Sequence, residues 1–253
     1  MSAGDVGWYL LLVGAGLIAG IVNSIAGGGS FLTLPALMLF GLDPKLANGT
    51  NRLAVLFSSA SAVATFQKHG HLNKRMVVRV GVPTLLGVPF GSLLAVHLSV
   101  DAFRGVFGIL FLVMAAIILM DPKRLTGREL DRETSVWKLS PIFLLIGVYV
   151  GFMQAGVGIL LLVAMSWVQS GDLIASNAVK NSVVFIVTLV ATLVFVLYGL
   201  VEWVPGLVMA CGNVVGGVVG ARLAIKKGNR LVFSFLVFVM VGTGVKMLFD
   251  AFV

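Results

Sequence analysis

Three stretches of the chain carry no charged residue over lengths close to that of a membrane-spanning helix. They are residues 80–100, 105–120 and 181–201. A helix needs about 20 mainly apolar residues to cross the hydrocarbon core of a bilayer. Only 11% of the 253 residues are charged and the mean hydropathy is +1.08, whereas a soluble domain has about 25% charged residues. The sequence therefore predicts an all-α polytopic membrane protein. A transmembrane β-barrel is excluded because its strands would show short alternating segments.

The distribution of Lys and Arg predicts which loops face the cytoplasm. Loop 67–79 contains four cations and no acid, and linker 121–138 contains five cations, as expected for cytoplasmic loops of a cell inner-membrane protein. The segments around Asp101 and Glu202 are poor in cations and are expected outside. The net charge of +8 is explained by this bias, so we do not predict nucleic-acid binding. The expected single spans are roughly 80–97, 104–120, 178–198, 203–223 and 231–250.

The chain contains an internal repeat with an offset of 129 residues. This offset aligns the glycine run at 27–29 with that at 156–158, and it aligns Asn48 with Asn177. It also pairs Gly70 with Gly199, Gly87 with Gly216 and Gly91 with Gly220. Several coincidences at one offset indicate a duplication. We therefore predict a first membrane repeat over residues 1–120, a linker over 121–138 and a second membrane repeat over 139–253.

The charge pattern gives the two repeats opposite orientations. Loop 67–79 is expected inside, while its repeat partner near Glu202 is expected outside. The segment near Asp101 is expected outside, while its partner at 226–230 is basic and expected inside. Inverted-topology repeats are typical of secondary transporters. Each repeat is predicted to contain a glycine-broken helical hairpin followed by three spanning helices.

The glycine run at 27–29 predicts a break in a helix, because glycine costs about 1 kcal/mol in a helix interior. Residues 31–40 are too few to span a bilayer, since ten helical residues cover about 15 Å. Residues 7–46 therefore form either two full crossings or a re-entrant hairpin. Taken alone, the glycines favour close helix packing. The alternative is that freed N–H groups at a helix start bind an anion.

Paired amides and cations follow each glycine run by about twenty residues. The sequence reads ANGTNR at 47–52 and SNAVKN at 176–181. Each half thus supplies Asn and one cation, Arg52 or Lys180. A cation within a membrane is costly and suggests a functional site, although both side chains could instead snorkel to the interface. No acidic residue is close in sequence, so a bound anion is a reasonable counter-ion.

Two longer signatures resemble those of the TauE/SafE family of sulfite exporters. The first is AGIVNSIAGGGSFLTLPAL followed by GLDPKLANGTN, and the second is GVYVGFMQAGVGILLL followed by ASNAVKN. The resemblance extends from about residue 7 to residue 250. It implies an integral membrane transporter of sulfur-containing anions such as sulfite or organosulfonates. Val157 interrupts the second glycine run, so the two hairpins need not contribute equally.

These observations predict a transporter that works by alternating access around a mid-membrane anion site. No enzymatic activity, metal or cofactor is expected, and the expected partners are a small anionic substrate and the lipid bilayer. A permease or channel for another small anion would share the same features. The expected substrate-binding residues are Asn23, Gly27, Gly28, Gly29, Ser30, Asn48, Asn51, Arg52, Gln154, Gly156, Gly158, Asn177, Lys180 and Asn181.

Overall fold

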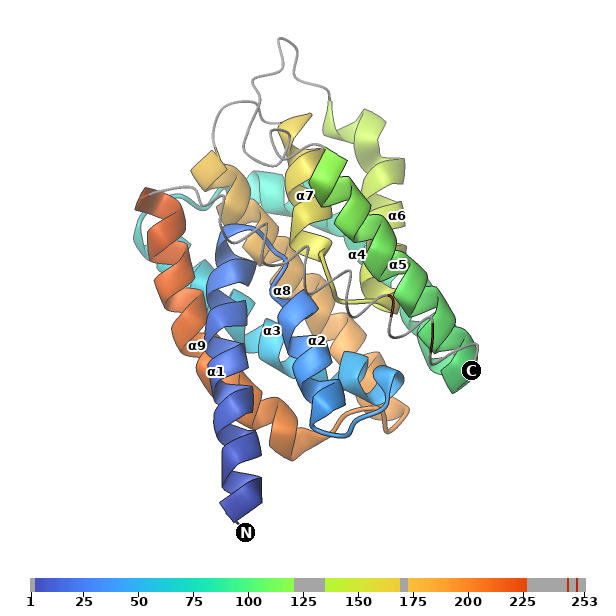
Figure 1. Cartoon of the computed structure of the whole chain (residues 1–253). Helices are drawn as coiled ribbons and strands as arrows, with labels where there is room; N and C mark the ends of the chain where they lie inside the picture. The colour runs from blue at the N-terminus through green and yellow to red at the C-terminus, as the bar shows by residue number, and fades with distance from the viewer. Residues whose placement is uncertain (1–2, 121–134, 169–172, 227–244, 246–248, 250–253) are drawn as a thin grey trace.

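A computed structural model describes residues 3–120, 135–168 and 173–226, together with residues 245 and 249. The regular secondary structure of these residues is helical throughout (Figure 1). The helices are α1 (Ala3–Ile25), α2 (Ser30–Leu39), α3 (Pro44–Lys68), α4 (Lys74–His97), α5 (Val100–Met120), the short 3₁₀ helix η2 (Val136–Leu139), α6 (Ser140–Phe152), α7 (Val157–Ser166), α8 (Leu173–Leu197) and α9 (Trp203–Lys226). The predicted span 231–250, except for residues 245 and 249, and most of linker 121–138 lie outside the described residues.

Four segments in the described part of the chain are long and apolar enough to cross a membrane. They are Val6–Ile25, Lys74–His97, Ile174–Leu197 and Trp203–Ile225. The helices extend beyond the predicted apolar spans. In particular, α4 begins at Lys74 rather than at residue 80, because Asn73 caps it by accepting a hydrogen bond from Met76 N–H (3.1 Å). The expected loop 67–79 is therefore shorter, and its last cations lie in the first turns of α4.

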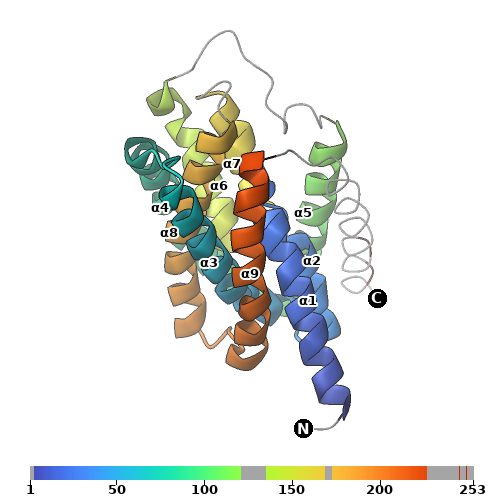
Figure 2. The same ribbon diagram turned by 90° about the vertical axis from the view of Figure 1, so that its left-hand side faces the viewer.

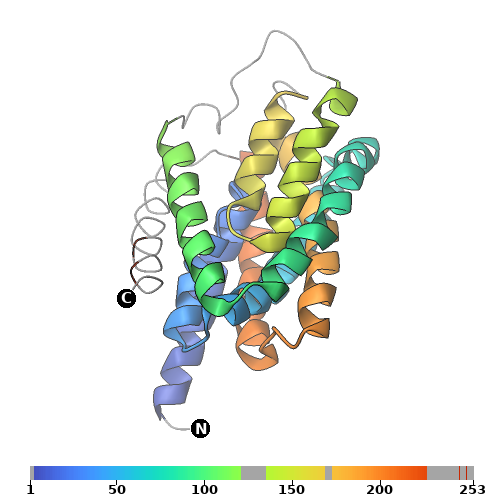
Figure 3. The same ribbon diagram turned by 90° about the vertical axis from the view of Figure 1, so that its right-hand side faces the viewer.

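Two short connections of four residues each interrupt the helices. Residues 26–29 separate α1 from α2, and residues 153–156 separate α6 from α7. Gly27 and Gly156 have φ values of +86° and +72°, a conformation that side chains with a Cβ rarely adopt. Figure 3 shows α6 and α7 as neighbouring helices that meet at their lower ends, while α2 lies in the lower half of the same view.

Glycines pack two pairs of helices in close contact. A Cβ atom on Gly16 or Gly20 of α1 would lie within 2.5 Å of α9 backbone oxygens, and one on Gly147 or Gly151 would lie within 2.1 Å of α4 oxygens. Accordingly, α1 and α9 run side by side (Figures 1 and 2). Packing is thus the role of these helical glycines, as small residues allow close backbone approach between membrane helices.

Aromatic packing fixes α2 against α5. The rings of Phe31 and Phe111 meet edge to face with centroids 5.0 Å apart, and Phe103 and Phe107 continue the cluster to Phe152 at the end of α6. All five side chains are buried. The cluster ties the short helix after the first break to the helix that ends the first predicted repeat.

Replacing Asp43 with alanine is expected to lower the free energy of unfolding by about 1 kcal/mol. The Asp43 carboxylate caps α3 by accepting from the N–H groups of Lys45 (2.9 Å) and Leu46 (3.2 Å). Asp43→Asn keeps an acceptor oxygen and should remain within a few tenths of a kcal/mol of wild type. Thermal unfolding in detergent checks both values, and equal losses for the two variants would contradict the capping role.

Candidate functional site

The first helix break meets the start of α7, just after the second break, at Gly27 and Gly158. A Cβ on Gly27 would lie 2.2 Å from the Cα of Gly158, and one on Gly158 would lie 2.4 Å from the Cα of Gly27. Neither position has room for a side chain. The first break and the start of α7, which are far apart in the sequence, are therefore in backbone contact.

Asn23 links the end of α1 to the first glycine run. Its Oδ1 accepts from Gly29 N–H at 2.8 Å. Its Nδ2 is buried and has no hydrogen-bond partner among the described residues. A buried donor without a partner costs about 1–3 kcal/mol. The amide nitrogen of Asn23 is therefore available to a ligand.

Lys180 holds the last turn of α1. The residue is only 1% exposed. Its Nζ donates to the carbonyl oxygens of Asn23 (2.9 Å) and Ser24 (3.2 Å) and to Oδ1 of Asn177 (2.9 Å). The carbonyls at a helix C-terminus lack intrahelical donors and carry a partial negative charge. A lysine from α8 thus satisfies the end of α1.

Arg52 holds the end of α6 in a comparable way. Its guanidinium donates to the carbonyl oxygens of Val150 (3.1 Å) and Gly151 (2.7 Å) and to Oε1 of Gln154 (3.0 Å). It also lies 4.3 Å from the centre of the Phe195 ring, a favourable cation–π distance. An arginine from α3 therefore satisfies the helix that precedes the second break.

The other four predicted asparagines are also engaged by the protein. Asn48 Nδ2 donates to Phe152 O (2.9 Å), and its Oδ1 accepts from Gln154 N–H (3.3 Å). Asn181 Nδ2 donates to Asn177 O (2.9 Å). Asn51 binds the hairpin after the first break, donating to Ser30 Oγ (3.0 Å) and accepting from Thr33 Oγ1.

These contacts change the interpretation of the two cations. The sequence suggested a bound anion as their counter-ion, because no acid lies near them. In the structure each cation instead faces the negative end of a helix dipole contributed by the other half of the chain. Arg52 is 0% exposed, and the snorkelling alternative does not describe its position.

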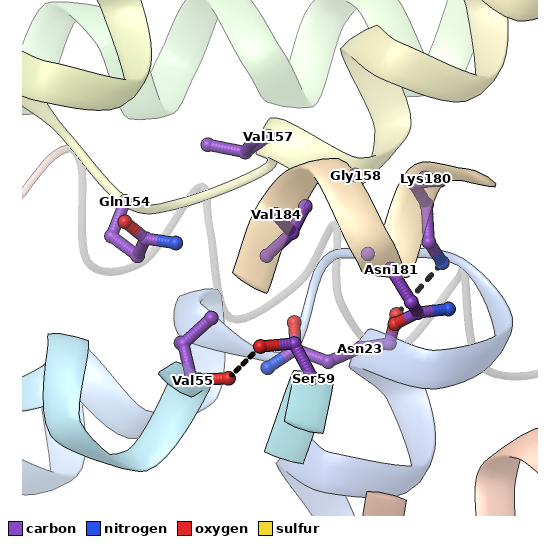
Figure 4. Close-up of a pocket in the computed structure, with 10 residues that line it drawn as sticks. Asn23, Val55, Ser59, Gln154, Val157, Gly158, Lys180, Asn181 and Val184 are labelled. Carbon is purple, nitrogen blue, oxygen red and sulfur yellow. Dashed lines mark hydrogen bonds between the residues drawn. The ribbon is translucent and has the colours of Figure 1, made fainter. Parts of the chain in front are cut away.

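A small cavity lies where the two breaks and helices α3 and α8 meet. Its free volume is about 10 Å³, room for about one water molecule. Figure 4 shows Lys180 hydrogen-bonded to Asn23 beside it. The cavity is lined by Asn23, Gly27, Val55, Ser59, Gln154, Val157, Gly158, Lys180, Asn181 and Val184.

Six of the predicted site residues line this cavity and eight lie elsewhere. The six are Asn23, Gly27, Gln154, Gly158, Lys180 and Asn181. The other eight, which pack around it or hold its walls, are Gly28, Gly29, Ser30, Asn48, Asn51, Arg52, Gly156 and Asn177. Sequence reasoning missed Ser59, whose hydroxyl donates to the carbonyls of Val55 (2.8 Å) and Leu56 (3.0 Å).

Two other lining residues that were not predicted, Val55 and Val184, lie on the same helix faces as predicted residues. Val55 follows Asn48 by seven residues on α3, and Val184 follows Asn177 by seven residues on α8. Residues spaced by seven lie on one face of a helix. The signal that could have found Val55 and Val184 was therefore the helical periodicity of the Asn motifs.

A second, larger hollow has different chemistry. It has a volume of about 460 Å³ and lies between α4, α5 and α6, where its lining is apolar except for Tyr149. The Tyr149 hydroxyl donates to Ala155 O at 2.6 Å. Among the described residues, no group of three or more His, Cys, Asp or Glu side chains could hold a metal ion. The polar cavity is therefore the candidate site.

The architecture is that of a multi-pass helical membrane protein, and comparison with known proteins identifies its family. The family model described as "Sulfite exporter TauE/SafE" matches residues 12–247. The chain belongs to this family, and it is a membrane transporter.

Curated relatives match along nearly the whole chain. The chain is 29% identical to "Probable membrane transporter protein ORF9" of Sinorhizobium sp, over 97% of this chain and 95% of that protein. It is 31% identical to "Probable membrane transporter protein YfcA" of Escherichia coli strain K12, over 93% and 87% of the two chains. No solved structure matches the chain significantly.

Proposed function

We propose that this protein is a secondary transporter that exports small sulfur-containing anions, such as sulfite or organosulfonates, by alternating access. The observation that carries the proposal is the polar cavity between the two helix breaks. It is lined by Lys180 and by Asn23, whose Nδ2 has no partner in the described structure. None of the ten described residues that line it is Asp or Glu.

The chemistry of the cavity suits an oxyanion. Sulfite and sulfonates each present three acceptor oxygens. The first backbone hydrogen bonds of α7 are donated by Ile159 and Leu160 to Gly156 O, so the amides of Val157 and Gly158 precede the first intrahelical bond. Such amides, together with the positive end of a helix dipole, favour anions. The side chains of Val55, Val157 and Val184 would face the uncharged part of a substrate.

An inverted repeat would supply the two alternating states. Both bounds of α8 follow those of α3 by 129 residues, and both bounds of α9 follow those of α4 by the same number. The packing is paired in the same way, because α1 lies against α9 while α6 lies against α4. These pairings support repeats over residues 1–120 and 139–253, each opening with a glycine-broken hairpin.

The small size of the cavity supports a state that does not admit the substrate. A free volume of about 10 Å³ holds one water molecule but not a sulfur oxyanion. Substrate must therefore enter through a rearrangement of the walls, as in transporters whose two repeats rock around a central site. A channel would instead need a continuous path wide enough for the anion, so a cavity of this size favours a transporter.

We place the protein in the cell inner membrane, with linker 121–138 and segment 67–79 in the cytoplasm, from the excess of cations in both segments. A membrane potential that is negative inside drives anions outward. Export thus needs no coupling ion. A permease for another small anion remains the second candidate, because the relatives' names give no substrate.

Flux into liposomes tests the substrate class. Purified protein would be reconstituted and given sulfite, methanesulfonate, sulfate, acetate and chloride at equal concentrations under an imposed potential. We expect sulfite or the sulfonate to move fastest, with saturable kinetics. Faster flux of acetate or chloride would support the permease for another anion, and flux that does not saturate would support a channel.

Asn23→Asp is expected to reduce anion flux at least tenfold, because it replaces the free donor by a carboxylate oxygen and removes one charge-assisted bond worth about 1.5–3 kcal/mol. The variant keeps the acceptor that binds Gly29 N–H. Asn73→Asp is the matched control, since Asn73 Oδ1 also accepts a backbone N–H, that of Met76 at 3.1 Å, away from the cavity. Equal flux through both variants would overturn the proposed site.

A further inference from the structure

We infer that Lys180 is an exchangeable tether: the transported anion takes its Nζ away from the end of α1 and thereby releases the hairpin formed by α1 and α2. The hairpin formed by α6 and α7 stays fixed by Arg52. This inference rests on the proposed anion transport and adds to it which hairpin moves and what triggers the movement.

All three N–H donors of Lys180 are hydrogen-bonded in the structure. An ammonium group has three N–H donors and no acceptor. The Nζ of Lys180 donates to three oxygens, those of Asn23, Ser24 and the Asn177 side chain, at 2.9–3.2 Å. An anion in the cavity that Lys180 lines can bind this Nζ only if at least one of these bonds is given up.

Loss of these bonds would weaken the attachment of α1 to α8. The carbonyls of Asn23 and Ser24 belong to the last turn of α1, where intrahelical donors are missing. The remaining bond from α8 to this turn in the described structure is the longer one from Asn181 Nδ2 to Ser24 O, at 3.4 Å. Leaving buried acceptors unsatisfied is costly, so the end of α1 would have to shift once Lys180 leaves it.

Arg52 lacks the freedom to act in this way. It does not line the cavity, and its guanidinium is held by two carbonyls, by Gln154 and by the Phe195 ring. Gln154 is itself fixed, because its Nε2 donates to Thr188 Oγ1 at 2.8 Å. A planar guanidinium held at several points is a rigid clamp, whereas a lysine ammonium on a flexible stem can move between partners.

Amide hydrogen exchange with and without anion tests the inference. The measurement uses wild-type protein with saturating sulfite and, separately, methanesulfonate, while isothermal titration in the same sample records binding. We expect exchange in residues 22–33 to become about tenfold faster on binding, from the loss of charged hydrogen bonds, while exchange in residues 150–160 does not accelerate. A site that merely encloses its ligand would instead slow exchange in both segments.

Two lysine variants provide the comparison. In Lys180→Gln, fast exchange at residues 22–33 is expected without anion and should not increase when anion is added. Lys45→Gln is the matched control, because Lys45 Nζ also donates to the carbonyls at a helix end, those of Val96 (3.0 Å) and Leu98 (2.8 Å), but does not line the cavity. It should respond to anion as wild type does. If Lys180→Gln does not fold, the same exchange measurement is made on Lys180→Arg, which keeps the charge.

The outcomes separate this inference from the proposed function. Binding of sulfite or methanesulfonate to wild type without faster exchange at residues 22–33 would overturn the tether alone. Acceleration in both hairpins, or an unchanged response in Lys180→Gln, would also overturn it. If neither anion binds wild type, the proposed substrate class is wrong. The inference that Lys180 moves from the end of α1 to such an anion is then wrong as well.

Discussion

Replacing Gly27 with alanine is expected to lower the free energy of unfolding by about 3 kcal/mol or more and to abolish transport. Two separate costs combine at this position. The backbone has φ +86°, where a Cβ costs roughly 1–2 kcal/mol. The same Cβ would lie 2.2 Å from the Cα of Gly158, and such overpacking costs typically 1–3 kcal/mol. The two breaks would be forced apart.

Two further glycines separate these costs. Gly70 has φ +76° but nothing within 4 Å of its Cβ position, so Gly70→Ala should show only the conformational cost. Gly158 lies in α7, and its Cβ would collide with Gly27 at 2.4 Å, so Gly158→Ala should show only the contact cost. Thermal unfolding in detergent compares the three variants. A loss for Gly27→Ala no larger than that for Gly70→Ala would refute the contact between the breaks.

The helical architecture could be predicted because it depends on local patterns. Uncharged runs of suitable length indicated the helices, and the end of α4 at His97 agrees with the predicted span. The positions of helix starts were less predictable, since they depend on caps and not on hydropathy. Lys74 begins α4 although it is charged, because Asn73 provides the N-terminal cap. Hydropathy placed this start six residues too late.

The polar residues of the site were found, but their partners were not. Asn23, Gln154 and Lys180 were selected from their spacing relative to the glycine runs. The sequence could not show that Lys180 meets Asn23 O across 157 residues, because that contact depends on how α8 crosses the end of α1. Backbone carbonyls also leave no signature in a sequence. A cation without a nearby acid therefore suggested an anion, although a helix end can neutralise the same charge.

Arg52→Ala is expected to lower the free energy of unfolding by about 3–5 kcal/mol, the second large effect. The change removes the Arg52 donors to the carbonyls of Val150 and Gly151 and to Gln154, although the Ser92 hydroxyl still donates to Gly151 O at 3.2 Å. It also leaves a space beside Phe195, against which the guanidinium packs at 4.3 Å. Buried acceptors without partners and the loss of packing act in the same direction. Arg52→Lys should lose less stability than Arg52→Ala, because a charged donor remains. It should still be less stable than wild type, because lysine lacks the planar guanidinium.

Asp101→Asn is the control for the loss of a charged contact at an exposed position. Asp101 accepts from Arg104 at 3.3 Å with its side chain 79% exposed, and an exposed pair contributes about 0–1 kcal/mol. Unfolding in detergent and sulfite titration are measured on the same samples. A clamp predicts a large loss of stability for Arg52→Ala, with sulfite affinity retained by the fraction that remains folded. Unchanged stability with lost sulfite affinity would instead make Arg52 a direct anion ligand, the role that its position in the sequence first suggested.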